Sequence, residues 1–115
     1  MTMKDITYRY YKAWVAQDRE RVRELLHADL EFTSQQDCFD SADSFLSACW
    51  RYSTGLTGVH FVKDVYQENR AFVILRWLIE DGSTFGGAEY LEATGDKIKK
   101  IMVINNDTRF EKVLR

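Results

Sequence analysis

The chain has 115 residues, of which 45% are hydrophobic, 14% aromatic and 30% charged, and its formal net charge is −2. This length supports one domain with a single core, and the charge balance lacks the basic excess typical of nucleic-acid binding. No apolar run approaches the roughly 20 residues of a membrane span, and the N-terminal residues lack the apolar core of a secretory signal. We therefore expect a cytoplasmic protein without nucleic-acid or membrane partners.

Three helices are predicted in the first half of the chain by the spacing of its apolar residues. The first spans residues 5–16 and begins with a capping-box pattern. A shorter helix follows Asp18, and a third follows Asp40 or Ser41. A short strand at residues 30–34 precedes the third helix.

From residue 59 the apolar period changes to two, which indicates strands. We predict a strand at 59–66, a β-hairpin over 70–93 and a last strand at 98–105, while residues 107–115 form a tail that is either a short helix or disordered. Residues 1–106 then make one α+β domain, with three helices packed on one face of a curved antiparallel sheet.

The hairpin is predicted to carry a polar pair. Its first strand is apolar on both faces but includes one charge, Arg76. If Asp81 and Gly82 form a two-residue loop, Ile74 faces Glu89, and Arg76 lies diagonal to Glu89 on the same face. On the inner face, this pair forms either a site for a ligand's carbonyl or carboxylate, or a buried ion pair without chemistry.

The opposite face of the same strand is apolar as well, whereas three helices can cover only one face of the sheet. An apolar patch of that size rarely stays in water. The sequence therefore predicts a homodimer packed through the outer sheet face. The residues assigned to this interface are Val73, Leu75, Trp77 and Ile79.

Several stretches together resemble the NTF2-like superfamily, specifically the SnoaL-like branch of polyketide cyclase- and ketosteroid isomerase-like proteins. They are an aromatic first helix ending in Ala16-Gln17-Asp18, the segment of residues 25–32, and the segment of residues 95–101 after the long strands. The resemblance covers about residues 5–106. It implies a cone-shaped fold in which the curled sheet and the first helix enclose a mostly apolar cavity, open at one end.

In the isomerases of this branch, a tyrosine and a protonated aspartic acid form an oxyanion hole, and a second aspartate moves the proton. The resemblance places Tyr10 at the tyrosine and Glu89 at the oxyanion-hole acid. Ser34 stands where the base is expected, which argues against steroid-type isomerisation, and Asp37 could compensate only if its loop folds inward. Similar epoxide hydrolases activate water with an Asp-Arg-Asp arrangement, but Arg76 lacks the neighbouring carboxylate.

The sequence thus predicts a protein with a cavity for a small apolar molecule that carries a carbonyl or carboxylate, with no metal and no cofactor. One alternative is an isomerase, dehydratase or cyclase acting on a small carbonyl compound, with Tyr10, Glu89 and Arg76 as catalytic residues. Another is a dimeric protein-interaction scaffold whose cavity is filled by its own side chains. Further cavity residues are expected to be Trp14, Phe32, Ser34, Trp50, His60, Phe61, Ile74, Leu91, Val103 and Asn105.

Overall fold

A computed structural model describes residues 1–104 of the chain. The predicted tail of residues 107–115, and Asn105 of the predicted site, lie outside the described residues. The elements are α1 (Met3–Val15), α2 (Arg19–Leu25), β1 (Leu26–Thr33), β2 (Cys38–Phe39), α3 (Ala42–Cys49), the 3-10 helix η1 (Trp50–Ser53), β3 (Leu56–Gln67), β4 (Arg70–Ile79), β5 (Thr84–Thr94) and β6 (Lys97–Ile104).

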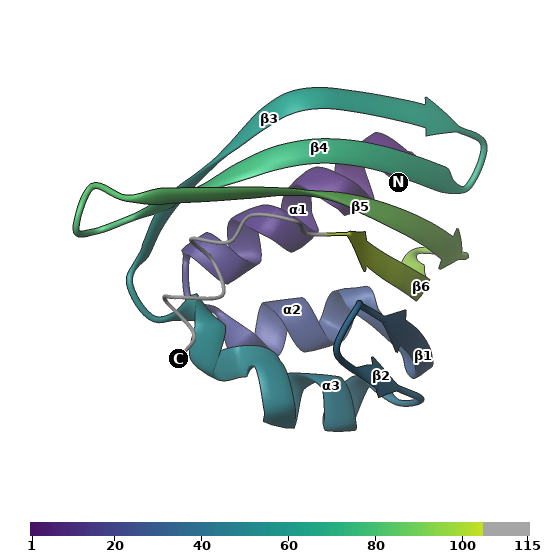
Figure 1. Cartoon of the computed structure of the whole chain (residues 1–115). Coiled ribbons are helices and arrows are strands. Elements are labelled where there is room, and N and C mark those ends of the chain that lie inside the picture. The colour runs from purple at the N-terminus through teal and green to yellow at the C-terminus, as the bar shows by residue number, and fades with distance from the viewer. Residues whose placement is uncertain (105–115) are drawn as a thin grey trace.

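The strands form one six-stranded sheet in the order β2-β1-β6-β5-β4-β3. Its long strands β3, β4 and β5 arch across one side of α1, and α2 lies on the other side of α1 (Figure 1). This arrangement confirms the predicted α+β class with three helices on a curved sheet. The sheet is not wholly antiparallel, because β1 pairs with β6 in parallel. None of the described helices is long and apolar enough to cross a membrane.

Helix α1 begins with the predicted capping box. The Thr2 hydroxyl accepts a hydrogen bond from the Asp5 amide, and the Asp5 carboxylate accepts one from the Thr2 amide, both at 3.1 Å. Because the helix lies between the sheet and α2, it is covered on more than one side. The neighbouring side chains Tyr10 and Tyr11 are consequently both buried, at 3% and 0% exposure.

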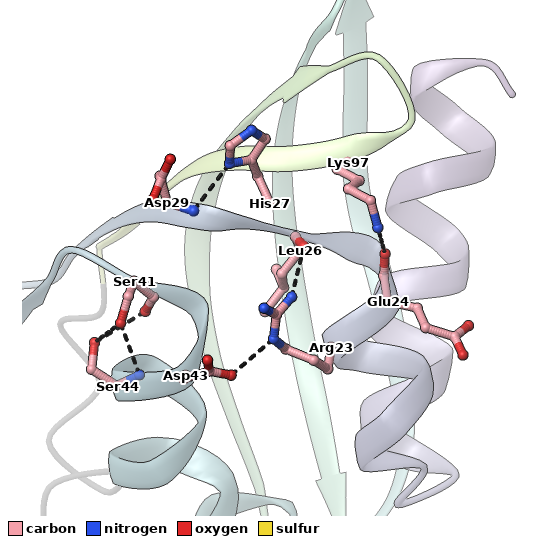
Figure 2. A network of polar contacts seen from close by, with 9 residues as sticks. All are labelled: Arg23, Glu24, Leu26, His27, Asp29, Ser41, Asp43, Ser44 and Lys97. Carbon is pink, nitrogen blue, oxygen red and sulfur yellow. Dashed lines mark hydrogen bonds and ion pairs between the residues drawn. The ribbon is translucent and has the colours of Figure 1, made fainter.

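A polar network fixes α2 and the start of β1 (Figure 2). The Arg23 guanidinium contacts the Asp43 carboxylate of α3 at 2.9 Å and also donates to the Leu26 carbonyl at 3.2 Å. Lys97 donates to the Glu24 carbonyl at 2.6 Å and so satisfies an acceptor in the last turn of α2. These contacts let the chain pass from helix to strand without a loop, so β1 begins four residues before the predicted strand.

The hairpin between β4 and β5 closes with a three-residue loop, residues 80–82, rather than the predicted two-residue loop. The Ile79 amide donates to the Ser83 carbonyl at 3.0 Å, which closes the hairpin around these residues. Gly82 has a φ of 89°, the left-handed conformation that completes a three-residue hairpin loop. The additional loop residue shifts the pairing of the two strands by one position.

This shift changes which side chains of β4 lie on the same face as Glu89, because side chains alternate along a strand. Val73, rather than Ile74, lies opposite Glu89. Val73 and Leu75 are 0% and 2% exposed, whereas Phe72 and Ile74 are 48% and 45% exposed. The assignment of an outer dimer interface to Val73, Leu75, Trp77 and Ile79 is therefore wrong, since these residues form the inner face.

Candidate functional site

A cavity of about 150 Å³ lies between α1 and the inner face of the sheet. Aromatic rings from the helices and from the inner face of strands β1, β4 and β5 build most of its wall. Trp77 packs edge-on against Tyr11 with ring centroids 5.7 Å apart, and Phe32 stacks on Phe45 at 4.5 Å. The aromatic residues of the wall are Tyr10, Tyr11, Trp14, Phe32, Phe45, Tyr52, Trp77 and Phe85.

Glu89 is the acidic group of the cavity's inner wall. Strand β5 holds it between Val73 of β4 and Val103 of β6, on the face that α1 covers. The Tyr11 hydroxyl donates a hydrogen bond to Glu89 Oε1 at 2.9 Å. Burial raises the pKa of Glu89 to about 7, although the hydrogen bond from Tyr11 favours the charged form. At neutral pH this carboxyl can therefore both release and accept a proton.

The two tyrosines beside Glu89 are neutral hydroxyls at physiological pH. Burial, together with the nearby Glu89 carboxylate, raises the pKa of both Tyr10 and Tyr11 well above 10. The resemblance had assigned the tyrosine of the site to Tyr10, which does line the cavity. The hydrogen bond to Glu89, however, comes from Tyr11.

The mouth of the cavity is formed in part by the turn between β1 and β2. The Ser34 amide donates to the Asp37 carbonyl at 2.8 Å, and the Asp37 amide donates to Ser34 Oγ at 3.1 Å. Both side chains line the cavity, so the turn does fold toward it, and Cys49 of α3 lies beside them on the wall. Burial and the Asp37 carboxylate raise the pKa of the Cys49 thiol to about 11, so the thiol stays protonated.

The structure brings together six of the predicted site residues. Those that line the cavity are Tyr10, Trp14, Phe32, Ser34, Glu89 and Val103. Trp50 packs against Trp14 at 4.8 Å between ring centroids, and Phe61 stacks on Tyr8 at 4.6 Å, but neither lines the cavity. Leu91 is fully buried in the core and does not reach the cavity.

Three predicted site residues lie on the outer face of the sheet instead. Ile74 and Arg76 are exposed there, and His60, also exposed, pairs with Arg76 across β3 and β4. The Arg76 guanidinium donates to Thr84 Oγ1 at 3.4 Å, on the face opposite Glu89. The predicted Arg76–Glu89 pair is therefore wrong, because it rested on a two-residue hairpin loop.

Sequence reasoning missed several residues of the wall for identifiable reasons. Trp77 was assigned to the outer face through the register error. Tyr11 was missed because the resemblance assigned the tyrosine of the site to Tyr10 alone, whereas α1 is buried on two sides and turns both side chains inward. The glycine at position 82 was the signal for a three-residue loop, since such loops also place glycine at their last position.

Comparisons with known proteins support the fold. No protein-family profile and no curated protein sequence matches the chain. Among solved structures, a Kribbella flavida protein matches with a TM-score of 0.85 and 19% identity, covering 96% of this chain and 91% of its own. An NTF2-like protein of unknown function from Cytophaga hutchinsonii matches with a TM-score of 0.78 and 11% identity, covering 96% of each chain.

A de novo designed protein with a curved β-sheet also matches, with a TM-score of 0.83, 16% identity and coverage of 97% of this chain and 90% of its own. The chain thus has the NTF2-like fold, which confirms the resemblance at the level of the fold. Because a designed protein shares this architecture, the fold by itself implies no activity. Function has to be argued from the cavity.

Proposed function

We propose that this protein binds a compact, mostly apolar small molecule in the cavity and holds the molecule's polar group at Glu89. The observation that carries this proposal is a carboxyl group placed in an otherwise aromatic wall. Burying a carboxyl costs free energy unless it is paired, and an apolar residue would pack the same space without that cost. Tyr11 contacts Oε1, and a ligand group in the cavity would provide a second partner.

The cavity volume sets the size of the ligand. A dry apolar cavity of about 150 Å³ is large enough to admit benzene, and this cavity has the same volume. We therefore expect a ligand of about six to nine non-hydrogen atoms, with a ring that packs against the aromatic wall. The scaffold alternative requires side chains to fill this space, so the open cavity favours a ligand.

NMR spectroscopy of labelled protein tests this proposal. Compounds with one ring and one polar substituent are added at millimolar concentration, and shifts are followed for the Trp14 and Trp77 indole N–H groups on the cavity wall. The outer-face residues Ile74 and Ile104 serve as the control. Perturbation of the wall without the outer face is expected, and the failure of every compound to shift the wall signals would overturn the proposal.

An acid–base enzyme is the second candidate, and the pKa of Glu89 near 7 favours it. Glu89 would take a proton from the carbon beside a substrate carbonyl and return it at another carbon, with a neutral Tyr11 or Tyr10 hydroxyl facing the developing enolate. Arg76 leaves this catalytic set because it lies on the outer face. Glu89-dependent exchange of substrate protons with deuterated water is the expected signature, and equal exchange by Glu89→Gln would remove this candidate.

We also propose that the outer sheet face packs against a second copy of the chain. Neighbouring strands place exposed apolar side chains there in adjacent positions. They are Val65, Phe72, Ile74, Met102 and Ile104. The same face carries both signs of charge, including the Arg70–Glu92 ion pair at 3.4 Å, so two copies related by a two-fold axis would not meet with charges of one sign only.

Sedimentation velocity at tens of micromolar tests the dimer. Ile74→Lys is expected to give a monomer, whereas Ser47→Lys, which adds the same charge on exposed α3, is expected to leave the dimer intact. If the wild-type chain sediments as a monomer, the dimer proposal is overturned and the ligand proposal is unaffected.

A further inference from the structure

The charged residues of the cavity wall indicate which chemical class of ligand the cavity would bind. Two charged residues are present in the part of the wall that the structure describes, Glu89 inside and Asp37 at the mouth, and both are acidic. None of the described basic side chains lines the cavity. Arg51 is a described cation near the mouth: its guanidinium donates to the Tyr52 hydroxyl at 3.0 Å and interacts electrostatically with Asp37.

Burial keeps three further titratable groups of the described wall neutral near pH 7. The hydroxyls of Tyr10 and Tyr11 stay protonated, as does the Cys49 thiol, and the Tyr52 hydroxyl accepts from Arg51. At the mouth, Arg51 interacts electrostatically with Asp37 and offsets part of its charge. The charge that the described wall presents to a ligand is therefore negative at Asp37, and at Glu89 it is zero or negative, depending on the protonation of that carboxyl.

One oxygen of Glu89 is open to the cavity. Among the described residues, the hydrogen bond to this carboxyl comes from the Tyr11 hydroxyl, which donates to Oε1. Among the described residues that are not exposed, every buried polar side-chain atom has a hydrogen-bond partner. Oε2 consequently has accessible surface, and Glu89 lines the cavity. A donor on a bound molecule can reach this oxygen.

Aromatic side chains complete the wall of the site. Tyr10 and Trp14 pack edge-on with ring centroids 6.3 Å apart, and Trp77 lies 6.4 Å from Phe85. Aromatic faces attract organic cations within about 6 Å of the ring centroid, and tryptophan does so most strongly. They have no comparable attraction for a carboxylate, which in this wall would also meet the negative charge of Glu89.

We propose that the ligand is a compact organic cation, a small cyclic or aromatic amine bound as its ammonium ion, with its N–H groups on Glu89 and its apolar part against the aromatic wall. This inference rests on the proposed function and specifies the ligand class. It differs from the carbonyl or carboxylate expected from the sequence. The expected carboxylate in particular loses its cationic partner, because Arg76 lies on the outer face. A charge-assisted hydrogen bond to the ammonium would stabilise the ionised form of Glu89 in the bound state.

Benzylammonium, benzyl alcohol and benzoate test the inference because they share a ring and differ mainly in charge. Isothermal titration calorimetry at pH 8 is expected to show binding of benzylammonium about tenfold or more tighter than that of benzyl alcohol, with benzoate the weakest of the three. Glu89→Gln is expected to remove the preference for the cation. Glu92→Gln, which removes the same charge from the outer face of the same strand, is expected to retain it.

The pH dependence supplies a test that needs no variant. If Glu89 must be ionised and its pKa is about 7, affinity for benzylammonium should rise about tenfold from pH 6 to pH 8, because the ionised fraction rises by that factor. A primary amine remains protonated across this range. Affinity that falls with rising pH, or is independent of pH, would contradict ammonium–carboxylate pairing.

The outcomes separate the two levels of the proposal. Tighter binding of benzyl alcohol or benzoate than of benzylammonium would overturn the cation and leave a small-molecule site in place. Failure of all three compounds, and of the set used for the NMR experiment, would overturn the small-molecule site and the cation together.

Discussion

The two faces of β4 have nearly the same hydrophobicity and opposite environments. Val73 and Leu75 are covered by α1 and the rest of the core, whereas Phe72 and Ile74, one residue away, are exposed. The difference arises from what lies above each face and from the loop that sets the register. Apolar character alone therefore does not say which face of a strand is buried.

The largest expected effect is the loss of a large side chain from the inner face. Leu75→Ala should reduce the free energy of unfolding by about 2–5 kcal/mol, because it removes a buried side chain and leaves a void. Leu78→Ala is the matched control on the outer face of the same strand, and we expect it to cost less than about 1 kcal/mol. Leu75 is 2% exposed and Leu78 is 37% exposed. Equal losses in urea denaturation would mean that Leu78 is as buried as Leu75 in the folded protein.

Because the carboxyl of Glu89 is buried, we expect an unusual pH dependence of stability. The pKa of Glu89 is raised from an ordinary value near 4.5 to about 7, so in this window the folded chain holds a proton that the unfolded chain has released. Stability should therefore fall as pH rises from 4.5 to 7, by about 3 kcal/mol from this group, and should level off above pH 7.

Glu89→Gln should abolish this fall and make the variant more stable than the unmodified protein at pH 8, by up to about 3 kcal/mol. Glu92→Gln removes an exposed ion pair with Arg70 on the same strand and should cost less than about 1 kcal/mol while keeping the fall. The free energy of unfolding, measured in urea at several pH values, decides the matter. A Glu89→Gln variant that still loses stability with rising pH would show that another group is responsible.

The two adjacent tyrosines should respond differently to the loss of a hydroxyl. Tyr11→Phe removes the donor to Glu89 Oε1, so the pKa of Glu89 should rise above 7, and stability at pH 8 should fall by about 2 kcal/mol. Tyr10→Phe should have the smaller effect on that pKa, because its hydroxyl interacts with Glu89 only through space. NMR titration of the Glu89 carboxyl measures both, and a larger shift in Tyr10→Phe would restore Tyr10 as the partner.

The order of the elements could be predicted because each depends on nearby residues. The capping box of Thr2 and Asp5, the helical stripe of Ile6, Tyr10 and Trp14, and the alternation along the hairpin all act over a few positions. The parallel pairing of β1 with β6 could not be predicted in this way, because it joins distant segments whose contacts leave no local signal.

The site was less predictable than the fold because its faces depend on a single loop residue. Both faces of β4 are apolar, so the period of two fixed the alternation without saying which set was inside. The lone charge of Arg76 was the one feature that favoured placing its side of β4 outward, since an unpaired buried arginine is costly. Pairing it with Glu89 across a two-residue loop hid that signal.

Arg76 therefore provides the smallest and most discriminating prediction. Arg76→Gln should change the free energy of unfolding by less than about 0.5 kcal/mol, because the guanidinium is exposed and reaches only the Thr84 hydroxyl among the described residues, at 3.4 Å. Arg70→Gln, which breaks the exposed ion pair to Glu92, is the matched control. A loss of about 3–5 kcal/mol for Arg76→Gln alone would indicate a buried pair with Glu89. That result would restore the two-residue loop and exchange the two faces of β4, since one register cannot place both Val73 and Arg76 beside Glu89.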